Sequence, residues 1–514
     1  MRFQKTVAFC LLLVMISGCG NHYEIETPAV DGGNSTVEEE DSAGEVIDFP
    51  GYVYDKEQAQ MVSRFSPMAV SEKGYYYIAN QILCFYDIES GLNVPLCSRV
   101  NCDHKDAQCD AYVFTAEIGG AETACNCMGE RIAYYDGRLY MIEVTDNREH
   151  ILYAYDEHFN NRQKIATLAA FSAEDPQILR EPETAVISEG YLFFYISWED
   201  IKYTVDYNVP VRCCRVALEQ DAEPEILGEF LFPGDYSMMR GGSNGHGILV
   251  SGGDVYFVSG ATARVYAAED PVQYVVARYH KASGEFEMLW THTGTEILDV
   301  LGEGTGRLLS TGREVMIDDQ GNLYFQTASA KATPEEMAYG IKAVNVVKFN
   351  PEDQSASVIY TTDYMGLLSF RSDGTSLYFF EFNEYLGGGE SALTVIDTDG
   401  NVIASKILPI DEAYLESFYQ YNERFPDNPA GLPTARSVEF YGVDDRYILL
   451  GAYALADAFK NLTSADTNTN WMSPTSENRL IIPLVGVGII SREQFLNGEG
   501  EELEIQQIFQ YPLW

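Results

Sequence analysis

From residue 50 onward, short runs of Tyr, Phe, Val and Ile alternate with polar turns that contain Gly or Asp. Runs of this length, closed by turn residues, are typical of β-strands joined in hairpins and not of amphipathic helices. One unit recurs along the chain: a Gly or Asp turn followed by an aromatic-rich strand. Its copies begin at Gly74, Asp136, Gly190, Gly253, Gly321, Gly374 and, in a weaker form, Asp445.

The spacing of these copies indicates a ring of small sheets. Measured from the turn glycine, or from Asp445 in the last copy, successive units are 53–71 residues apart, and a second strand such as 82–87 or 393–397 follows several of them. A small antiparallel sheet cannot bury both faces alone, so a long-period repeat of such sheets is typical of a β-propeller. We therefore predict an all-β, seven-bladed propeller over residues 50–514. A pair of packed β-sheets is the main alternative, but seven units favour the ring.

The propeller prediction sorts the loops between two faces. If the Gly or Asp turns join the first and second strands of each blade, the loops between the second and third strands lie on the opposite face. The connections between blades share that opposite face. The long loops fall there, at 197–210, 259–273, 327–343 and 454–478. Long loops gathered on a rigid scaffold are where binding usually occurs.

The first 19 residues have the pattern of a lipoprotein signal. Arg2 and Lys5 form a basic head, and the apolar run 7–16 is too short to span a bilayer. The sequence Ile16-Ser17-Gly18-Cys19 resembles the bacterial lipobox, in which the Cys is acylated and becomes the mature N-terminus. An ordinary signal peptide with a chance Cys is the alternative. Two or more acyl chains would anchor the protein stably, so we predict an outward-facing, membrane-anchored protein attached through Cys19.

The distribution of charge predicts a tether after the signal and argues against one class of partner. Residues 20–49 contain no Lys or Arg but include an acidic run at 38–41, a composition that predicts a disordered tether. After removal of Arg2 and Lys5, 31 basic residues face 78 acidic ones, a formal charge of −47. Nucleic-acid binding draws on clustered Lys and Arg, so this chain is not expected to bind nucleic acid.

A cysteine-rich segment lies between the first and second predicted blades. It reads PLCSRVNCDHKDAQCDAY over residues 95–112, which spaces its ligand-type side chains as C-x4-C-x-H-x4-C. The pattern P-L-C-x4-C-x-H-x4-C-x-A-Y, matched here from Pro95 to Tyr112, resembles a family of uncharacterised lipoproteins from anaerobic clostridial bacteria. The resemblance covers about 40 residues and implies a lipoprotein with a propeller-like repeat domain, without implying an activity.

The segment has two competing chemical interpretations. Three thiolates and one imidazole, from Cys97, Cys102, His104 and Cys109, are a sufficient set for a closed tetrahedral zinc site with a structural role. Alternatively, the eight cysteines other than Cys10 and Cys19 form disulfides, as secreted proteins often do, or remain partly free. The neighbouring pair Cys213-Cys214 lies in a predicted strand, where alternation sends the two thiols to opposite faces.

Catalytic motifs do not emerge from the sequence. HExxH, GxSxG, a P-loop and a GxGxxG leading from a strand into a helix are all absent. The first hypothesis is therefore a non-catalytic binding propeller for a protein, peptide or glycan. The second is an extracytoplasmic carbohydrate lyase or hydrolase on the same scaffold, built from residues of different blades. The third, a solute-binding lipoprotein of a transporter, would require long amphipathic helices that this strand-rich chain lacks.

Overall fold

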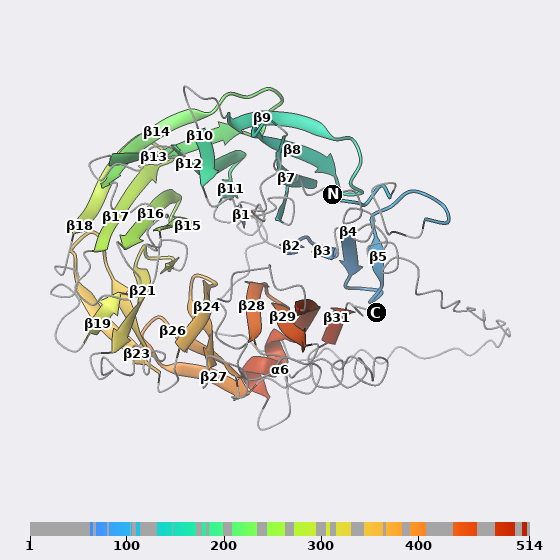
Figure 1. Ribbon diagram of the computed structural model, residues 1–514. Coiled ribbons are helices and arrows are strands. Elements are labelled where there is room, and N and C mark those ends of the chain that lie inside the picture. Colours follow the sequence, from blue (N-terminus) through green and yellow to red (C-terminus); the bar gives the residue numbers. More distant parts are fainter. Residues whose placement is uncertain are drawn as a thin grey trace, which may run out of the picture.

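A computed structural model shows seven small antiparallel sheets arranged in a ring, which is a seven-bladed β-propeller (Figure 1). The fold class predicted from the repeat is therefore confirmed. The residues that the structure describes are 62–64, 68–79, 82–102, 104, 109–113, 131–145, 147–170, 177–180, 185–198, 208–233, 244–262, 272–293, 305–308, 315–329, 344–362, 366–382, 391–407, 435–459, 479–498 and 506–510. The predicted signal, residues 1–19, and the predicted tether, residues 20–49, lie outside them.

The blades follow one another along the chain, from the innermost strand of each to the outermost. Blade 1 contains β2 (Met68–Val70), β3 (Gly74–Ala79), β4 (Ile82–Asp87) and β5 (Asn93–Pro95). Blade 2 contains β6 (Ile132–Tyr135), β7 (Arg138–Val144), β8 (His150–Asp156) and β9 (Gln163–Ala169). Blade 3 contains β10 (Gln177–Arg180), β11 (Val186–Ser188), β12 (Tyr191–Trp198), β13 (Asn208–Ala217) and β14 (Glu225–Pro233).

The remaining blades repeat this arrangement. Blade 4 contains β15 (Asn244–Ser251), β16 (Asp254–Thr262), β17 (Val272–His280) and β18 (Glu285–Thr293). Blade 5 contains β19 (Thr305–Leu308), β20 (Met316–Ile317), β21 (Leu323–Ser329), β22 (Val344–Phe349) and β23 (Ala356–Thr361). Blade 6 contains β24 (Gly366–Ser372), β25 (Ser376–Phe382), β26 (Ser391–Asp397) and β27 (Val402–Ile407). Blade 7 contains β28 (Ala435–Val443), β29 (Tyr447–Phe459), β30 (Arg479–Ser491) and β31 (Gln506–Gln510), with helix α6 (Arg492–Asn497) before β31.

Each recurrent Gly or Asp turn joins the first and second strands of a blade, as the sequence predicts. We call the face that carries these turns the turn face, and the opposite face, which carries the second loop of each blade and the connections between blades, the loop face. At Gly374 the turn requires glycine, because φ is +93° and a Cβ atom would come within 2.4 Å of an Asp319 oxygen. Most of the long loops predicted on the loop face lie outside the described residues.

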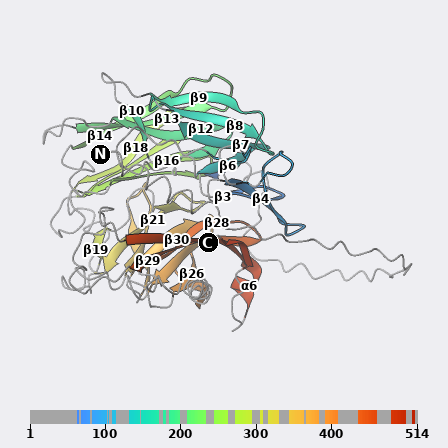
Figure 2. The same cartoon turned by 45° about the vertical axis from the view of Figure 1, so that its right-hand side comes forward.

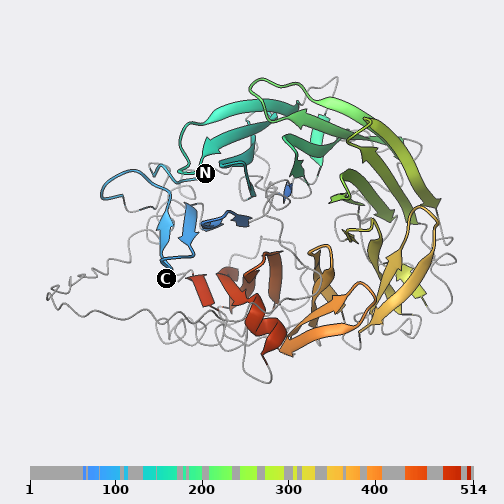
Figure 3. The same cartoon turned by 180° about the vertical axis from the view of Figure 1, so that it is seen from behind.

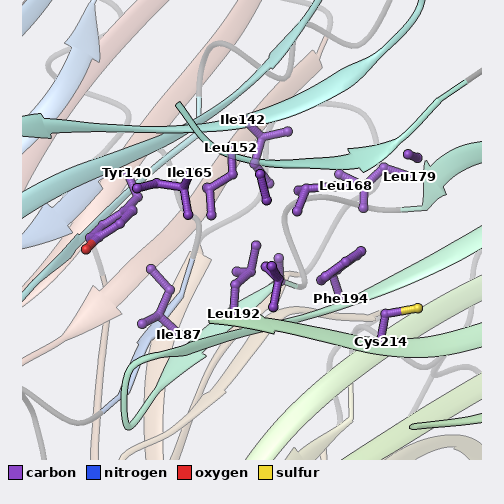
Figure 4. Packing of buried hydrophobic residues seen from close by; sticks show 14 of the residues in the cluster. Tyr140, Ile142, Leu152, Ile165, Leu168, Leu179, Ile187, Leu192, Phe194 and Cys214 are labelled. Atoms are coloured by element: carbon purple, nitrogen blue, oxygen red, sulfur yellow. The ribbon is translucent and has the colours of Figure 1, made fainter. Parts of the chain in front are cut away.

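Packing between neighbouring blades forms the core. Alternation sends side chains from both faces of each sheet into the two adjoining junctions, which explains the near-continuous apolar runs of the middle strands. Between blades 2 and 3, for example, Ile142, Leu152, Leu192 and Phe194 interdigitate with almost no exposed surface (Figure 4).

The two ends of the ring meet without sharing a strand. Blade 1 and blade 7 lie side by side, and each contains only strands from its own part of the chain (Figures 1 and 3). One strand departs from the pattern: β1 (Val62–Arg64) pairs with β11 of blade 3 rather than with its sequence neighbour β2. The blade 7–blade 1 junction is closed by side chains instead, chiefly a shared apolar cluster and a hydrogen bond from Tyr75 to Asp444.

Candidate metal centre

The segment after β5 leaves the outer edge of blade 1 at Leu96 and returns to the blade at Ala111 and Tyr112; we call it the excursion. The N–H of Leu96 donates to the carbonyl of Leu83 over 2.9 Å, and the N–H of Leu83 donates to the carbonyl of Ala111 over 2.8 Å. A bridge between Ile82 and Tyr112 continues the pairing. Both ends of the excursion are thus fixed on one residue of β4. Because Ile82 begins β4 at the loop face, the segment lies on that face, as its position between two blades predicts.

A side-chain clamp holds the base of the excursion. Asp110 accepts a hydrogen bond from Ser98 Oγ over 2.7 Å and contacts Arg99 Nε at 2.8 Å. The bond from Ser98 and the charge of Arg99 lower the pKa of Asp110. The clamp therefore joins the residues directly after Cys97 to the residue directly after Cys109.

Within this excursion, all four side chains singled out in the sequence come together. One ligand atom from each of Cys97, Cys102, His104 and Cys109 lies within 4.8 Å of the others, and His104 Nδ1 is 3.3 Å from Cys109 Sγ. Cys109 is buried and the other three are half-buried. For Zn–S bonds of 2.3 Å, two sulfurs of a tetrahedral site are about 3.8 Å apart. The distances between the donor atoms would therefore have to shorten by no more than about 1 Å for the group to hold an ion.

The backbone adopts unusual angles to bring the donors together. Asn101 and His104 both have positive φ angles, of 62° and 51°. Asn and His are among the residues that tolerate this left-handed region best. The turn at Asn101 comes directly before Cys102, and the turn at His104 places its ring nitrogen against Cys109. The residue types between the cysteines therefore fit the folded path of the segment.

The surroundings favour a thiolate at one of the positions. Burial by itself would raise the pKa of Cys97, but backbone N–H groups of Arg99 and Asp110, together with the neighbouring thiols, donate to its sulfur and hold its pKa below the ordinary value. Burial raises the pKa of Cys109 to about 12. A cation bound among these donors would favour thiolates at all three cysteines, since thiolates are the ligating form.

The segment also packs against the junction that closes the ring. Cys109 and Ala111 belong to a buried cluster with Tyr75 and Tyr77 of blade 1 and Leu449 and Ile489 of blade 7, and Cys97 and Cys102 contact this cluster. A metal that fixes the segment would therefore brace the blade 7–blade 1 junction from the loop face.

No disulfide forms among the described cysteines, which are free thiols in the structure: Cys84, Cys97, Cys102, Cys109, Cys213 and Cys214. Cys84, Cys213 and Cys214 take no part in the four-donor group. Cys84 is buried in β4, and burial raises its pKa to about 11. Cys213 and Cys214 pack on opposite faces of β13, in the junctions with blades 4 and 2, as the predicted alternation requires. Cys19, Cys125 and Cys127 lie outside the described residues.

The sequence did not reveal the tyrosine partners of the carboxylates that anchor the turns on the turn face. Asp318 and Asp373 each accept a hydrogen bond from a tyrosine of their own blade, Tyr324 at 2.7 Å and Tyr378 at 2.8 Å. In blade 7 the equivalent Asp444 accepts from Tyr75 of blade 1 at 2.6 Å, and this bond joins the two ends of the ring. The two pairs within a blade share a local sequence pattern, in which the Asp comes five or six residues before the Tyr. The pair between Tyr75 and Asp444 has no such pattern.

Comparisons with known proteins extend this description only at the level of fold. No family model matches the chain, and no curated protein matches it in sequence. Among solved structures, a puromycin hydrolase is similar over 87% of this chain and 54% of its own, with 10% identity and a TM-score of 0.43. An exo-β-1,3-galactanase from Clostridium thermocellum, 1,3Gal43A, is similar over 63% of this chain and 60% of its own, with 11% identity and a TM-score of 0.30.

A calcium-binding protein, regucalcin, from Agrobacterium tumefaciens is similar over 67% of this chain and 85% of its own, with 15% identity and a TM-score of 0.27. The chain spans little more than half the length of puromycin hydrolase. At this distance the likenesses carry no conclusion about activity, and the fold rests on the strand pairing described above. Within the described residues, no helix combines the length and apolar character needed to cross a bilayer.

Proposed function

We propose that the protein is a lipid-anchored, extracytoplasmic binding propeller that takes a protein, peptide or glycan on its loop face. The observation that carries this proposal is the length of the β29–β30 hairpin. Its strands pair from Tyr447–Ser491 to Phe459–Arg479, thirteen residues each, whereas β25 and β26 of blade 6 have seven. Both hairpins begin beside a turn on the turn face, so the extra six residues extend blade 7 by about 20 Å at the loop face.

Two features make this part of the loop face a good surface for recognition. The long hairpin (β30 is the long red strand in Figure 2) rises from blade 7, and the cysteine segment lies on blade 1 directly across the closing junction. A projecting sheet beside a loop that is fixed at both ends offers a partner strand edges on a rigid scaffold. The anchor at Cys19 would present this surface outside the cell.

We further propose that the four-donor group holds zinc in a structural role. Three sulfurs and an imidazole nitrogen are the donors that zinc accepts in closed tetrahedral sites, whereas calcium and magnesium prefer oxygen. Four protein ligands leave no position open for a substrate. What zinc would supply here is a cross-link within the excursion, and the chain's own contribution is the clamp at Asp110 and the paired ends on Leu83.

A truncation of the hairpin tests the binding proposal. Replacement of residues 455–483 by Asn-Gly, a favoured two-residue hairpin turn, would reduce β29 and β30 to the length of their neighbours. The parent and shortened proteins would be applied to arrays of bacterial surface glycans and peptides. We expect ligands that bind the parent and not the shortened protein, with the ring still folded by circular dichroism.

A turn-face variant, Lys73→Ala, serves as the matched control and should bind as the parent does. Equal binding by the parent and the shortened protein would contradict the proposal. Release of products from an arrayed carbohydrate would instead support the enzyme hypothesis.

A further inference from the structure

Strand β1 connects the N-terminal part of the chain to the axis of the ring. Val62, Ser63 and Arg64 pair antiparallel with Ser188, Ile187 and Val186 of β11, the innermost strand of blade 3. Figures 1 and 3 show β1 inside the ring, away from its rim. The chain therefore enters the propeller through the middle and not at the outer edge of blade 1.

The direction of β1 fixes the face from which the chain enters. The first strand of each blade runs toward the turn face, and β11 ends there at the Glu189–Gly190 turn. Because β1 is antiparallel to β11, it runs from the turn face toward the loop face, and Val62 lies opposite Ser188, next to that turn.

We infer that the N-terminal tether leaves the ring at the axis of the turn face, and that this face is turned toward the bilayer. The loop face, with the β29–β30 hairpin and the cysteine segment, then points away from the membrane. This inference rests on the proposed lipid anchor at Cys19, and it names the surface that a partner outside the cell would meet.

The length of the tether supports this orientation. Residues 20–61 separate Cys19 from β1, which is 42 residues. A chain of this length with the disordered character that the composition predicts for residues 20–49 would have a root-mean-square reach of about 36 Å. To put the loop face against the membrane, it would have to cross a blade of four strands, about 14 Å wide, and then pass the depth of the ring, about 24 Å for strands of seven residues. That path consumes the whole average reach, so the turn face is favoured.

The charge of the turn face implies that it stands above the lipid and does not lie on it. The turns there carry exposed acidic residues in five blades, namely Glu72, Asp136, Glu189, Asp319 and Asp445. Lys281 pairs with Glu189 and Arg446 pairs with Asp445, so ion pairs neutralise only part of this charge. Lys73 pairs with a further acidic residue, Glu157. Acidic side chains are repelled by anionic lipid, so the tether sets the height of the ring above the membrane.

Energy transfer to the membrane tests the orientation. Two residues of blade 1 lie on opposite faces: Lys73, whose side chain is 71% exposed, on the turn face, and Val100, which is 88% exposed, on the loop face. Each would be replaced by an unnatural amino acid that carries a donor dye, in the full-length lipidated protein in phosphatidylcholine vesicles with an acceptor lipid. We expect at least about twofold greater transfer from position 73, because the faces are about 24 Å apart. Equal transfer, or greater transfer from position 100, would overturn the inference.

Two further arms separate this inference from the proposed anchor. An N-terminal His tag in place of Cys19, bound to vesicles with a nickel-chelating lipid, reports the orientation even if Cys19 is not acylated. Fatty-acid labelling of the wild-type protein and of Cys19→Ala tests the anchor independently. A variant with proline at all three positions of β1, Val62→Pro, Ser63→Pro and Arg64→Pro, removes every backbone donor of β1 and so disrupts its pairing with β11. It should reduce the difference between the two donor positions while the seven blades remain folded, and an unchanged difference would show that β1 does not set the orientation.

Discussion

The junction between blades 3 and 4 and the junction between blades 7 and 1 are held together differently. Between blades 3 and 4, aromatic rings from both sheets interlock. The ring centre of Phe257 lies 6.5 Å from that of Phe193 and 5.4 Å from that of Tyr195, and both pairs meet edge to face. Between blades 7 and 1, Leu449 and Ile489 pack on tyrosines, and a buried carboxylate, Asp444, accepts the hydroxyl of Tyr75. The cysteine segment covers this second junction from the loop face.

The difference follows from what each junction must join. Blades 3 and 4 are consecutive, so residues that meet between them are separated by only a short stretch of chain. Tyr75 and Asp444 are 369 residues apart, and the entropic cost of closing a loop grows with its length. Non-directional packing suffices where the chain already keeps two sheets together. At the ring closure, a directional hydrogen bond also fixes which sheet is the neighbour, and the proposed zinc site would cross-link the segment that packs there. We expect the two junctions to respond to different perturbations.

The largest effect is expected from a cavity in the aromatic junction. Phe257→Ala removes a ring with no exposed surface, and large-to-small changes of this kind cost about 3–5 kcal/mol. Chemical denaturation should show this loss in the free energy of unfolding, with unchanged metal content. Val358→Ala, at a 42% exposed position on the outer strand of blade 5, is the control and should cost little. A loss below 1 kcal/mol for Phe257→Ala would mean that the aromatic packing does not hold this junction.

Acid should weaken the interior of blade 2 through a buried histidine. Burial, and then the charge of Arg148, lower the pKa of His150 to about 4. Its ordinary pKa is about 6.5, so the unfolded state binds more protons between these values and stability falls as the pH drops through this window. The loss is at most about 3–4 kcal/mol, since the pKa falls by about 2.5 units and each unit corresponds to 1.36 kcal/mol.

This pH dependence can be separated from that of other groups. His150→Leu should flatten the dependence of unfolding free energy on pH between 6.5 and 4, whereas His158→Gln, at a 74% exposed position in the same blade, should not. Identical pH profiles for the wild-type protein and His150→Leu would show that His150 is not buried in its neutral form.

The smallest effect separates the two kinds of tyrosine–carboxylate pair. Tyr75→Phe removes one donor to the buried Asp444 and should cost about 1–3 kcal/mol. Tyr324→Phe removes the same chemistry from Asp318, but within blade 5. We expect similar losses of stability from both variants and faster hydrogen exchange in β3 and β29 from Tyr75→Phe alone. If Tyr324→Phe had the same effect on β3 and β29, the Tyr75 bond would have no special part in ring closure.

The sequence predicts those parts of the fold that depend on local pattern. Each Gly or Asp turn from Gly74 to Asp445 joins two strands of one blade, because turn chemistry and apolar alternation act within about ten residues. The four donors from Cys97 to Cys109 were also found from their spacing, since they lie in one short segment. The signal, the tether and acylation at Cys19 stay predictions.

Long-range contacts were not predictable in the same way. No local pattern relates Val62 to Ser188, because one strand pairs with another through backbone atoms that every residue shares. The bond between Tyr75 and Asp444 likewise joins two residue types that are common in this chain. Whether the thiols face one another or form other bonds depends on the path of the backbone, including the left-handed residues Asn101 and His104.

Hydrogen exchange with and without metal tests most directly whether a metal-pinned segment braces the ring closure. Residues 20–514, purified without oxygen, would be weighed by native mass spectrometry and then exchanged before and after chelation. We predict one bound zinc, and faster exchange after its removal in β3, β4, β29 and β30 but not in β12 or β16. Cys102→Ala should reproduce this result, and Cys84→Ala, at a buried thiol outside the four-donor group, should not. A protein without metal, or exchange that rises equally in all blades, would contradict the account.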